Sequence, residues 1–230
     1  MKIKFKSIIA IAVFYVIAIT LRYLTNKTSI LTGIENDFLK TILQGIGPAV
    51  GALVACVFFR IKMEMGLRGN FRNSTIPLLI YWIFPIFLIG TVAYFTNGTL
   101  PFVPIITILI YGLLEEIGWR GFLQQILKPL PKFVGILTIA VLWFIWHLNF
   151  EISISNLLFF GILLLGSWGI GLVADKTKSL LAVASFHSLN NFFTELNTQK
   201  IIILTILLTV WILSIIYRKK FEKKEYEEIK

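Results

Sequence analysis

Two adjacent carboxylates and an arginine, Glu115, Glu116 and Arg120, lie inside a hydrophobic stretch of the sequence. Each such charge costs about 2.5 kcal/mol or more at the centre of a membrane helix. It is tolerated there where it pairs, faces a polar cavity or takes part in chemistry. Two other apolar stretches each contain one of the two histidines of the chain, His147 and His187. Carboxylates and imidazoles on separate membrane helices are the groups that an intramembrane hydrolase needs to activate water.

The spacing of these residues suggests different roles for the two carboxylates. Glu116 and Arg120 are four residues apart and share a helix face, in the favourable order of acid before base. Glu115 points about 100° away from that face and has no such partner. It is therefore the candidate proton acceptor for a water molecule. His187 and Asn191 are also four apart, and two donors aimed at one point can hold an oxyanion.

A depth estimate tests whether the three stretches meet. Counting about 1.5 Å per helical residue from the flanking lysines places Glu115, His147, His187 and Asn191 in one layer of the membrane. These residues can therefore line one cavity. Structural roles are the alternative, because an ion pair or a single histidine also joins membrane helices by hydrogen bonds. Transporters place such groups there too, usually in chains built from two related halves with interrupted helices, and no such halves are evident here.

The composition is that of a polytopic membrane protein. The 230 residues are 57% hydrophobic and 15% charged, whereas soluble domains have about 25% charged residues. We expect one integral membrane domain over residues 1–230. Cys56 is the single cysteine, so the chain has no internal disulfide. The net charge of +10 resides in short loops and tails, which favours lipid head groups and argues against nucleic acid as the partner.

An all-α transmembrane bundle of about eight helices is predicted, because a span needs about 20 mostly apolar residues. The candidates lie near residues 7–25, 41–59, 75–95, 101–126, 133–149, 156–173, 179–195 and 200–217. The first is expected to be a retained helix and not a signal peptide. Within the second, Gly47, Gly51 and Ala55 form a stripe of small residues typical of close helix packing.

The positive-inside rule predicts that both termini are cytoplasmic. With that orientation, cytoplasmic segments hold Lys2, Lys4, Lys6, Arg60, Lys62, Arg68, Arg72, Lys128, Lys132, Lys176, Lys178, Arg218, Lys219, Lys220, Lys223, Lys224 and Lys230. The outer segments hold only Arg22, Lys27, Lys40 and Lys200. A miscounted helix would scramble this asymmetry.

Three motifs in this order resemble the CAAX prenyl protease and bacteriocin-processing (CPBP, or Abi-like) family of intramembrane proteases. The first is Glu115-Glu116-Ile-Gly-Trp-Arg120, and the third is His187-Ser-Leu-Asn190-Asn191. In the second, Trp143 stands where the family usually has phenylalanine, four residues before His147. The resemblance places a catalytic core at about residues 101–195.

The resemblance implies hydrolysis of a peptide bond within the membrane. In the roles that it carries over, Glu115 and His147 activate water, His187 and Asn191 stabilise the oxyanion, and Glu116 with Arg120 supports the site. The partner is a membrane-embedded peptide or protein. Bacterial relatives are linked to peptide maturation and bacteriocin self-immunity, and the Lys-, Ile-, Phe- and Asn-rich composition favours a bacterial plasma membrane. A non-catalytic immunity or scaffold protein is the main alternative, and a proton-coupled transporter the next.

A divalent metal is the cofactor to consider, because the family is often described as metalloproteases. Zinc in catalytic sites takes three protein ligands and a water, and Glu115, His147 and His187 are the residues that could supply them. The chain has no His-Glu-x-x-His pair. The sequence therefore favours a glutamate-based site without metal.

Overall fold

The computed structural model describes residues 3–70, 75–76, 78–192, 198–210 and 213, and these residues form helices joined by loops, with no strand. The helices are α1 (Phe5–Lys27), α2 (Asp37–Gly45), α3 (Gly47–Phe59), α5 (Phe84–Asn97), α6 (Phe102–Glu116), α7 (Gln125–Leu127), α8 (Lys132–Trp146), α9 (Ile154–Thr177) and α10 (Leu180–Phe192), with a further helix over 198–210. Short 3₁₀ and π-helical segments cover Ser29–Leu31, Leu79–Ile83 and Ile117–Gln124. The predicted all-α bundle is confirmed.

Several of these helices are apolar enough for a membrane. In the described part of the chain, α1, the continuous run Phe102–Leu127 and α9 are each long enough to span a bilayer by length and composition. The pair α2 and α3 passes the same test together, and four shorter apolar helices cover residues 84–96, 132–146, 180–189 and 198–210. The chain is an integral membrane protein. The predicted C-terminal tail, from Arg218 to Lys230, lies outside the described residues.

The prediction of one helix over 41–59 was wrong, because α2 and α3 are bent by 44° at Ile46. Pro48 explains the break, since proline has no N–H with which to bind the carbonyl four residues earlier. That carbonyl belongs to Gln44, and it accepts a hydrogen bond from Arg22 Nη1 on α1 at 3.1 Å instead. The break thus ties three helices together.

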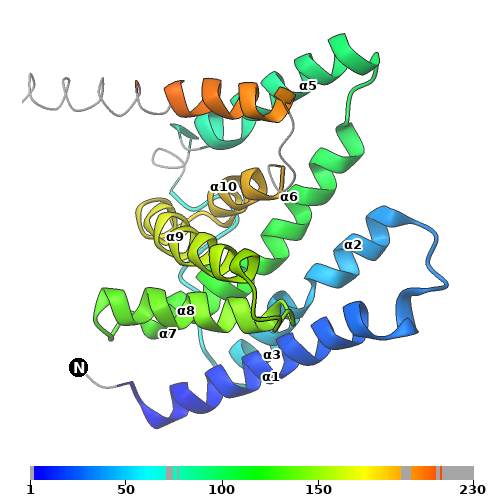
Figure 1. The fold of residues 1–230 in the computed structure, drawn as a ribbon. Coiled ribbons are helices and arrows are strands. Elements are labelled where there is room, and N and C mark those ends of the chain that lie inside the picture. The colour runs from blue at the N-terminus through cyan, green and yellow to red at the C-terminus, as the bar shows by residue number, and fades with distance from the viewer. Residues whose placement is uncertain (1–2, 71–74, 77, 193–197, 211–212, 214–230) are drawn as a thin grey trace, which may run out of the picture.

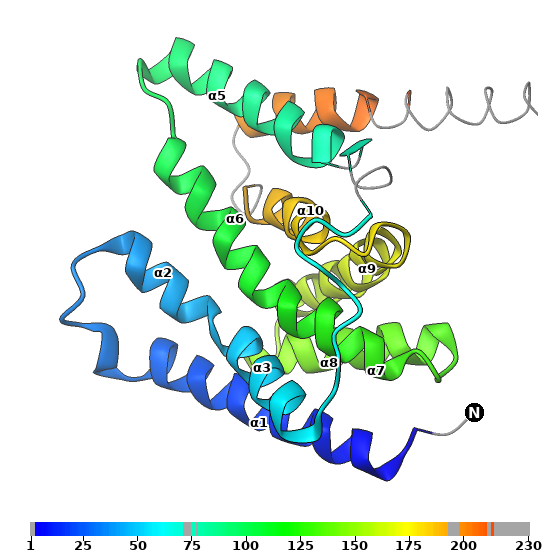
Figure 2. The same ribbon diagram turned by 180° about the vertical axis from the view of Figure 1, so that it is seen from behind.

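The helices pack around α6 and the π-helical segment that follows it. In Figure 1, α6 runs diagonally through the molecule, with α1, α2 and α3 on one side and α9 and α10 on the other. Figure 2 shows the same arrangement from behind, and in both views the 198–210 helix lies along α5. The core contains the fully buried rings of Phe14, Trp119, Phe122 and Trp146.

Helices α1 and α3 pack closely at the predicted small-residue stripe, which confirms its packing role. A Cβ atom at Gly47 would lie 2.6 Å from the Ala18 carbonyl oxygen, and one at Gly51 would lie 2.4 Å from that of Phe14. Both contacts are to backbone, which cannot rotate away.

Gly51→Ala is therefore expected to lower the free energy of unfolding by about 1–3 kcal/mol, as overpacking does in well-packed cores. Gly161→Ala in α9 is the matched control, because nothing lies within 4 Å of its added Cβ. Thermal unfolding of both variants in detergent gives the comparison. An equal effect of the two substitutions would show that the close approach of α1 and α3 is not what Gly51 provides.

Three loops predicted to share the cytoplasmic side contact one another. Gly66 donates to the Lys178 carbonyl at 3.1 Å, and Leu181 donates to that of Leu67 at 3.0 Å. Glu64 forms an ion pair with Lys128, and the hydrogen bond from this lysine lowers the pKa of Glu64. The loops after α3, α7 and α9 therefore lie together. This agrees with their predicted place on one side of the membrane, because loops on the same side are separated by an even number of membrane crossings.

Candidate active site

The two carboxylates lie where α6 widens into the π-helical segment Ile117–Gln124. Wide turns of this kind are frequent at functional sites, because they change which side chains share a face. Gly118 in this segment lets α3 approach, since a Cβ there would lie 2.5 Å from Pro48 Cβ and 2.7 Å from its carbonyl oxygen. The segment is thereby fixed against α3, with Glu115 and Glu116 at its start.

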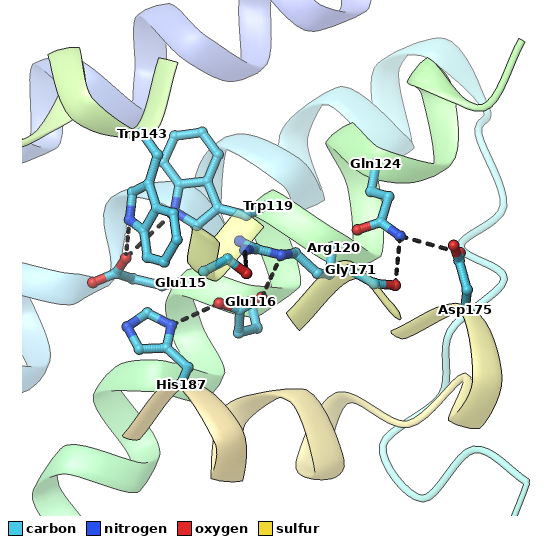
Figure 3. A network of polar contacts seen from close by, with 10 residues as sticks. Glu115, Glu116, Trp119, Arg120, Gln124, Trp143, Gly171, Asp175 and His187 are labelled. Atoms are coloured by element: carbon cyan, nitrogen blue, oxygen red, sulfur yellow. Dashed lines mark hydrogen bonds and ion pairs between the residues drawn. The ribbon is translucent and has the colours of Figure 1, made fainter. Parts of the chain in front are cut away.

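Glu115 is held by indole groups and not by a cation. Its Oε2 accepts hydrogen bonds from Trp143 Nε1 at 2.7 Å and from Trp119 Nε1 at 3.4 Å (Figure 3). The residue is 1% exposed, and within the described ranges no cation lies at ion-pair distance from it. The expectation that Glu115 lacks the charged partner of Glu116 is confirmed.

Glu116 joins two helices through two basic groups. Its Oε1 lies 2.6 Å from His187 Nδ1 on α10, and its Oε2 lies 3.2 Å from Arg120 Nε (Figure 3). The second contact is an ion pair without hydrogen-bond alignment. Arg120 also donates to the Gly166 carbonyl at 3.4 Å and stacks 4.8 Å above the Trp143 ring. The predicted Glu116–Arg120 pair is confirmed, whereas the link to His187 was not foreseen.

His147 is oriented by its own helix end. Its Nδ1 lies 2.7 Å from the Trp143 carbonyl. Since a carbonyl only accepts, Nδ1 carries the hydrogen and Nε2 keeps its lone pair. The ring packs at centroid distances of 5.2 Å from Trp146 and 4.8 Å from Phe159. Among the described residues it makes no hydrogen bond to Glu115 or to another ionisable side chain.

Trp143 is the contact point of the predicted motifs. Besides binding Glu115, its ring lies 5.1 Å from His187 and 6.3 Å from His147, measured between ring centroids. The structure thus brings Glu115, Glu116, Arg120 and His187 into one network. His147 packs against the Trp143 ring of this network. Asn191 is half-buried on α10, one turn beyond His187.

Arg22 is a neighbour of the site that the sequence analysis assigned to an outer loop. That assignment was wrong, because Arg22 lies within α1 and its guanidinium stacks 4.3 Å above the Trp146 ring. Its Nη1 also lies 3.3 Å from the Tyr111 hydroxyl, one helical turn before Glu115. An arginine inside the first apolar stretch was the signal that could have identified it.

The suggested metal ligands are not grouped for a metal. Among the described residues, no three His, Cys, Asp or Glu side chains lie close enough together to hold an ion. The Nδ1 atoms of His147 and His187 already contact the Trp143 carbonyl and Glu116. Glu115, His147 and His187, the residues considered as zinc ligands, are therefore not placed to hold one zinc ion together.

Residues 96–193 match the family described as type II CAAX prenyl endopeptidase Rce1-like. This stretch, here called the CPBP segment, is therefore similar to that family of proteases. The match includes all three motifs and every residue of the network described above, whereas α1 to α3 lie outside it. No match was found among the curated proteins. The resemblance that the motifs predicted is confirmed for the CPBP segment.

The Trp143 indole gives the CPBP segment a testable feature, because phenylalanine is usual there. Trp143→Phe keeps a ring against His187 and removes the 2.7 Å hydrogen bond to Glu115. Hydrogen bonds to charged groups are worth about 1.5–3 kcal/mol, so we expect kcat for peptide cleavage to fall by about tenfold or more. Trp119→Phe removes the longer bond of 3.4 Å and should cost less. The reverse order of the two effects would contradict this account of Glu115.

Proposed function

We propose that the chain is an intramembrane endopeptidase in which Glu115 and His147 activate water for attack on a peptide bond. The observation that carries the proposal is the setting of Glu115. It is a buried carboxylate held by two indole N–H groups instead of a cation, and the Trp143 ring that binds it also packs against His147 and His187. A carboxylate neutralised by a cation would be a poor proton acceptor, whereas Glu115 keeps that capacity.

The proposed proton path begins at Glu115. Both indoles bind Oε2 of Glu115, and the other carboxylate oxygen points away from them (Figure 3). That oxygen accepts a proton from water while the water oxygen bonds to the carbonyl carbon of the substrate. The same proton then passes to the amide nitrogen as the C–N bond breaks, giving a carboxylic acid and an amine, and the acid then loses its proton to the amine or to water. The Nε2 lone pair of His147 is the second acceptor available to the water.

His187 and Asn191 stabilise the oxyanion in this proposal. The Nδ1 contact with Glu116 fixes the ring of His187, which leaves Nε2 as the donor toward substrate. When both nitrogens carry hydrogen, the Glu116 carboxylate balances the positive charge of the ring. The Asn191 amide, one turn further along α10, supplies a second donor. Arg120 acts through Glu116 and is a positioning residue.

The substrate in this proposal is a membrane-embedded peptide or protein, cleaved near the membrane boundary. The bacterial plasma membrane is the proposed location, and peptide maturation or bacteriocin self-immunity the proposed biological role. These assignments are supported by the composition and by the family resemblance. A non-catalytic immunity protein and a proton-coupled transporter are the competing functions, and both predict that no peptide bond is broken.

The test is cleavage of a panel of membrane-spanning peptides by the protein reconstituted in liposomes, read by mass spectrometry. His147→Gln is expected to lower the cleavage rate by about a hundredfold or more, the range for loss of an acid–base group. A chelator should leave the rate of the wild type unchanged. Loss of cleavage with chelator and its return with zinc would overturn the metal-free form of the proposal. A rate unchanged by His147→Gln would remove this residue from the mechanism.

A further inference from the structure

A polar pocket lies between α7, α8 and α9. It has a volume of about 150 Å³. Its polar lining consists of Gln124, Lys128, Lys132, Ser167 and Asp175, with Gly171 at its wall. α7 and α9 end here and α8 begins here. The pocket therefore lies at the level where helices leave the bilayer, on the side of the lysine-rich loops.

Two polar atoms in this pocket have no hydrogen-bond partner among the residues that the structure describes. Ser167 is 1% exposed, and its hydroxyl oxygen is unpaired. The Nε2 of Gln124 donates to Asp175 Oδ1 and to the Gly171 carbonyl, each at 3.1 Å (Figure 3). That orientation leaves Oε1 of Gln124 as a buried acceptor without a donor. Because buried polar groups in proteins are nearly always paired, these two atoms indicate a ligand with hydrogen-bond donors.

The pocket also contains charges of both signs. Lys128 and Lys132 line one part of it, and the N-terminus of α8, which has no side-chain cap, adds a partial positive charge beside Lys132. Asp175 supplies a carboxylate, whose Oδ1 is 3.9 Å from Lys178 Nζ. A simple anion would match the lysines but would leave Asp175 and the Gln124 acceptor unsatisfied. A zwitterion satisfies both parts.

We propose that this pocket binds the phosphoethanolamine head group of a membrane phospholipid. Lys132 and the α8 N-terminus receive the phosphate, and Lys128, which also forms the ion pair with Glu64, lines the same part of the pocket. The primary ammonium donates to Asp175 and to Gln124 Oε1, which are neighbours because Gln124 Nε2 binds the same aspartate at 3.1 Å. Ser167 lies two turns earlier on α9, about 12 Å from Asp175 along the helix, so it lines the pocket without binding the same ammonium. A choline head group has no N–H donor, and a glycerol head group has no cation, so neither satisfies this set.

The surroundings of the pocket fit a lipid better than a free metabolite. Trp168, which also lines it, is 52% exposed, and Phe133 beside Lys132 is 66% exposed. Tryptophan is enriched at membrane–water interfaces, where its ring lies at the level of the head groups. These apolar side chains offer acyl chains a surface that continues from the polar pocket.

The test is lipid retention by the full chain, purified from nanodiscs that contain equal amounts of phosphatidylethanolamine, phosphatidylcholine and phosphatidylglycerol, and read by native mass spectrometry. The wild type should retain phosphatidylethanolamine with a preference of about tenfold, since a site built to bind an N–H group rejects analogues that lack it. Soluble phosphoethanolamine is added in a separate arm. Displacement of the lipid by equimolar amounts of this compound would show a free metabolite to be the ligand and would overturn the lipid assignment.

Variants separate the two halves of the head group. Asp175→Asn should reduce the preference for phosphatidylethanolamine, whereas Lys132→Gln should reduce retention of all three lipids. Lys27→Gln, an exposed lysine at the end of α1, is the control for loss of a positive charge and should change nothing. Equal retention of the three lipids by the wild type, or an unchanged preference in Asp175→Asn, would overturn the proposal.

Discussion

Glu115→Gln is expected to lower kcat for cleavage of a membrane peptide by about a thousandfold, within the range for removal of a general base. The amide keeps the size of the side chain and can still accept the hydrogen bonds of Trp143 and Trp119 through its carbonyl oxygen. It cannot take a proton from water. Because substrate contacts are unchanged, KM should stay within a small factor of the wild-type value. Initial rates in proteoliposomes measure both constants.

Glu151→Gln is the matched control for this experiment. It makes the same chemical change at an exposed residue between α8 and α9. It should leave kcat and thermal stability at wild-type values. If Glu115→Gln retained wild-type activity, water would have to be activated by another residue, and the role given to Glu115 would be wrong.

Arg120→Met is expected to destabilise the fold by about 3–5 kcal/mol, the cost of leaving one member of a buried ion pair without its partner. Glu116 and Arg120 are 0% and 1% exposed, so water cannot replace the lost charge. Methionine retains much of the apolar volume, which limits the effect of a cavity. Unfolding in detergent with increasing denaturant measures the change, with the wild type as reference.

A second substitution distinguishes charge from packing. The double variant Arg120→Met, Glu116→Leu removes both charges and should recover most of the lost stability, because an apolar pair of similar volume replaces a buried ion pair at little cost. It should not recover cleavage, since His187 loses the carboxylate that contacts its Nδ1. If the double variant were as unstable as Arg120→Met, packing and not the unpaired carboxylate would explain the loss.

The apolar stretches and the motif spacing predicted most of this arrangement. Hydropathy identified the bundle, and the four-residue spacing identified the Glu116–Arg120 pair. The bend at Ile46 was not predicted, although Pro48 was the signal for it. By length and hydropathy alone, a 19-residue apolar stretch with one proline is predicted to be a single membrane span. The bend becomes predictable only when one considers that the proline leaves the carbonyl four residues earlier without a partner in the helix.

Contacts between distant helices could not be predicted from spacing. The bond from Trp143 to Glu115 joins residues 28 apart, and that from His187 to Glu116 joins residues 71 apart. Both depend on the angle at which α8 and α10 cross α6. Helix periodicity gives the face of a side chain on its own helix but not the partner that it meets.

The central claim is that Glu115 activates water for direct attack on a peptide bond. The most direct measurement uses one cleaved peptide in water enriched in heavy oxygen, with wild type and Glu115→Gln in excess over substrate. The account predicts that the wild type gives fragments whose new carboxylate carries one solvent oxygen, that no covalent adduct forms on the protein, and that Glu115→Gln gives almost no product. A peptide linked to Glu115, or equal product from both proteins, would contradict it.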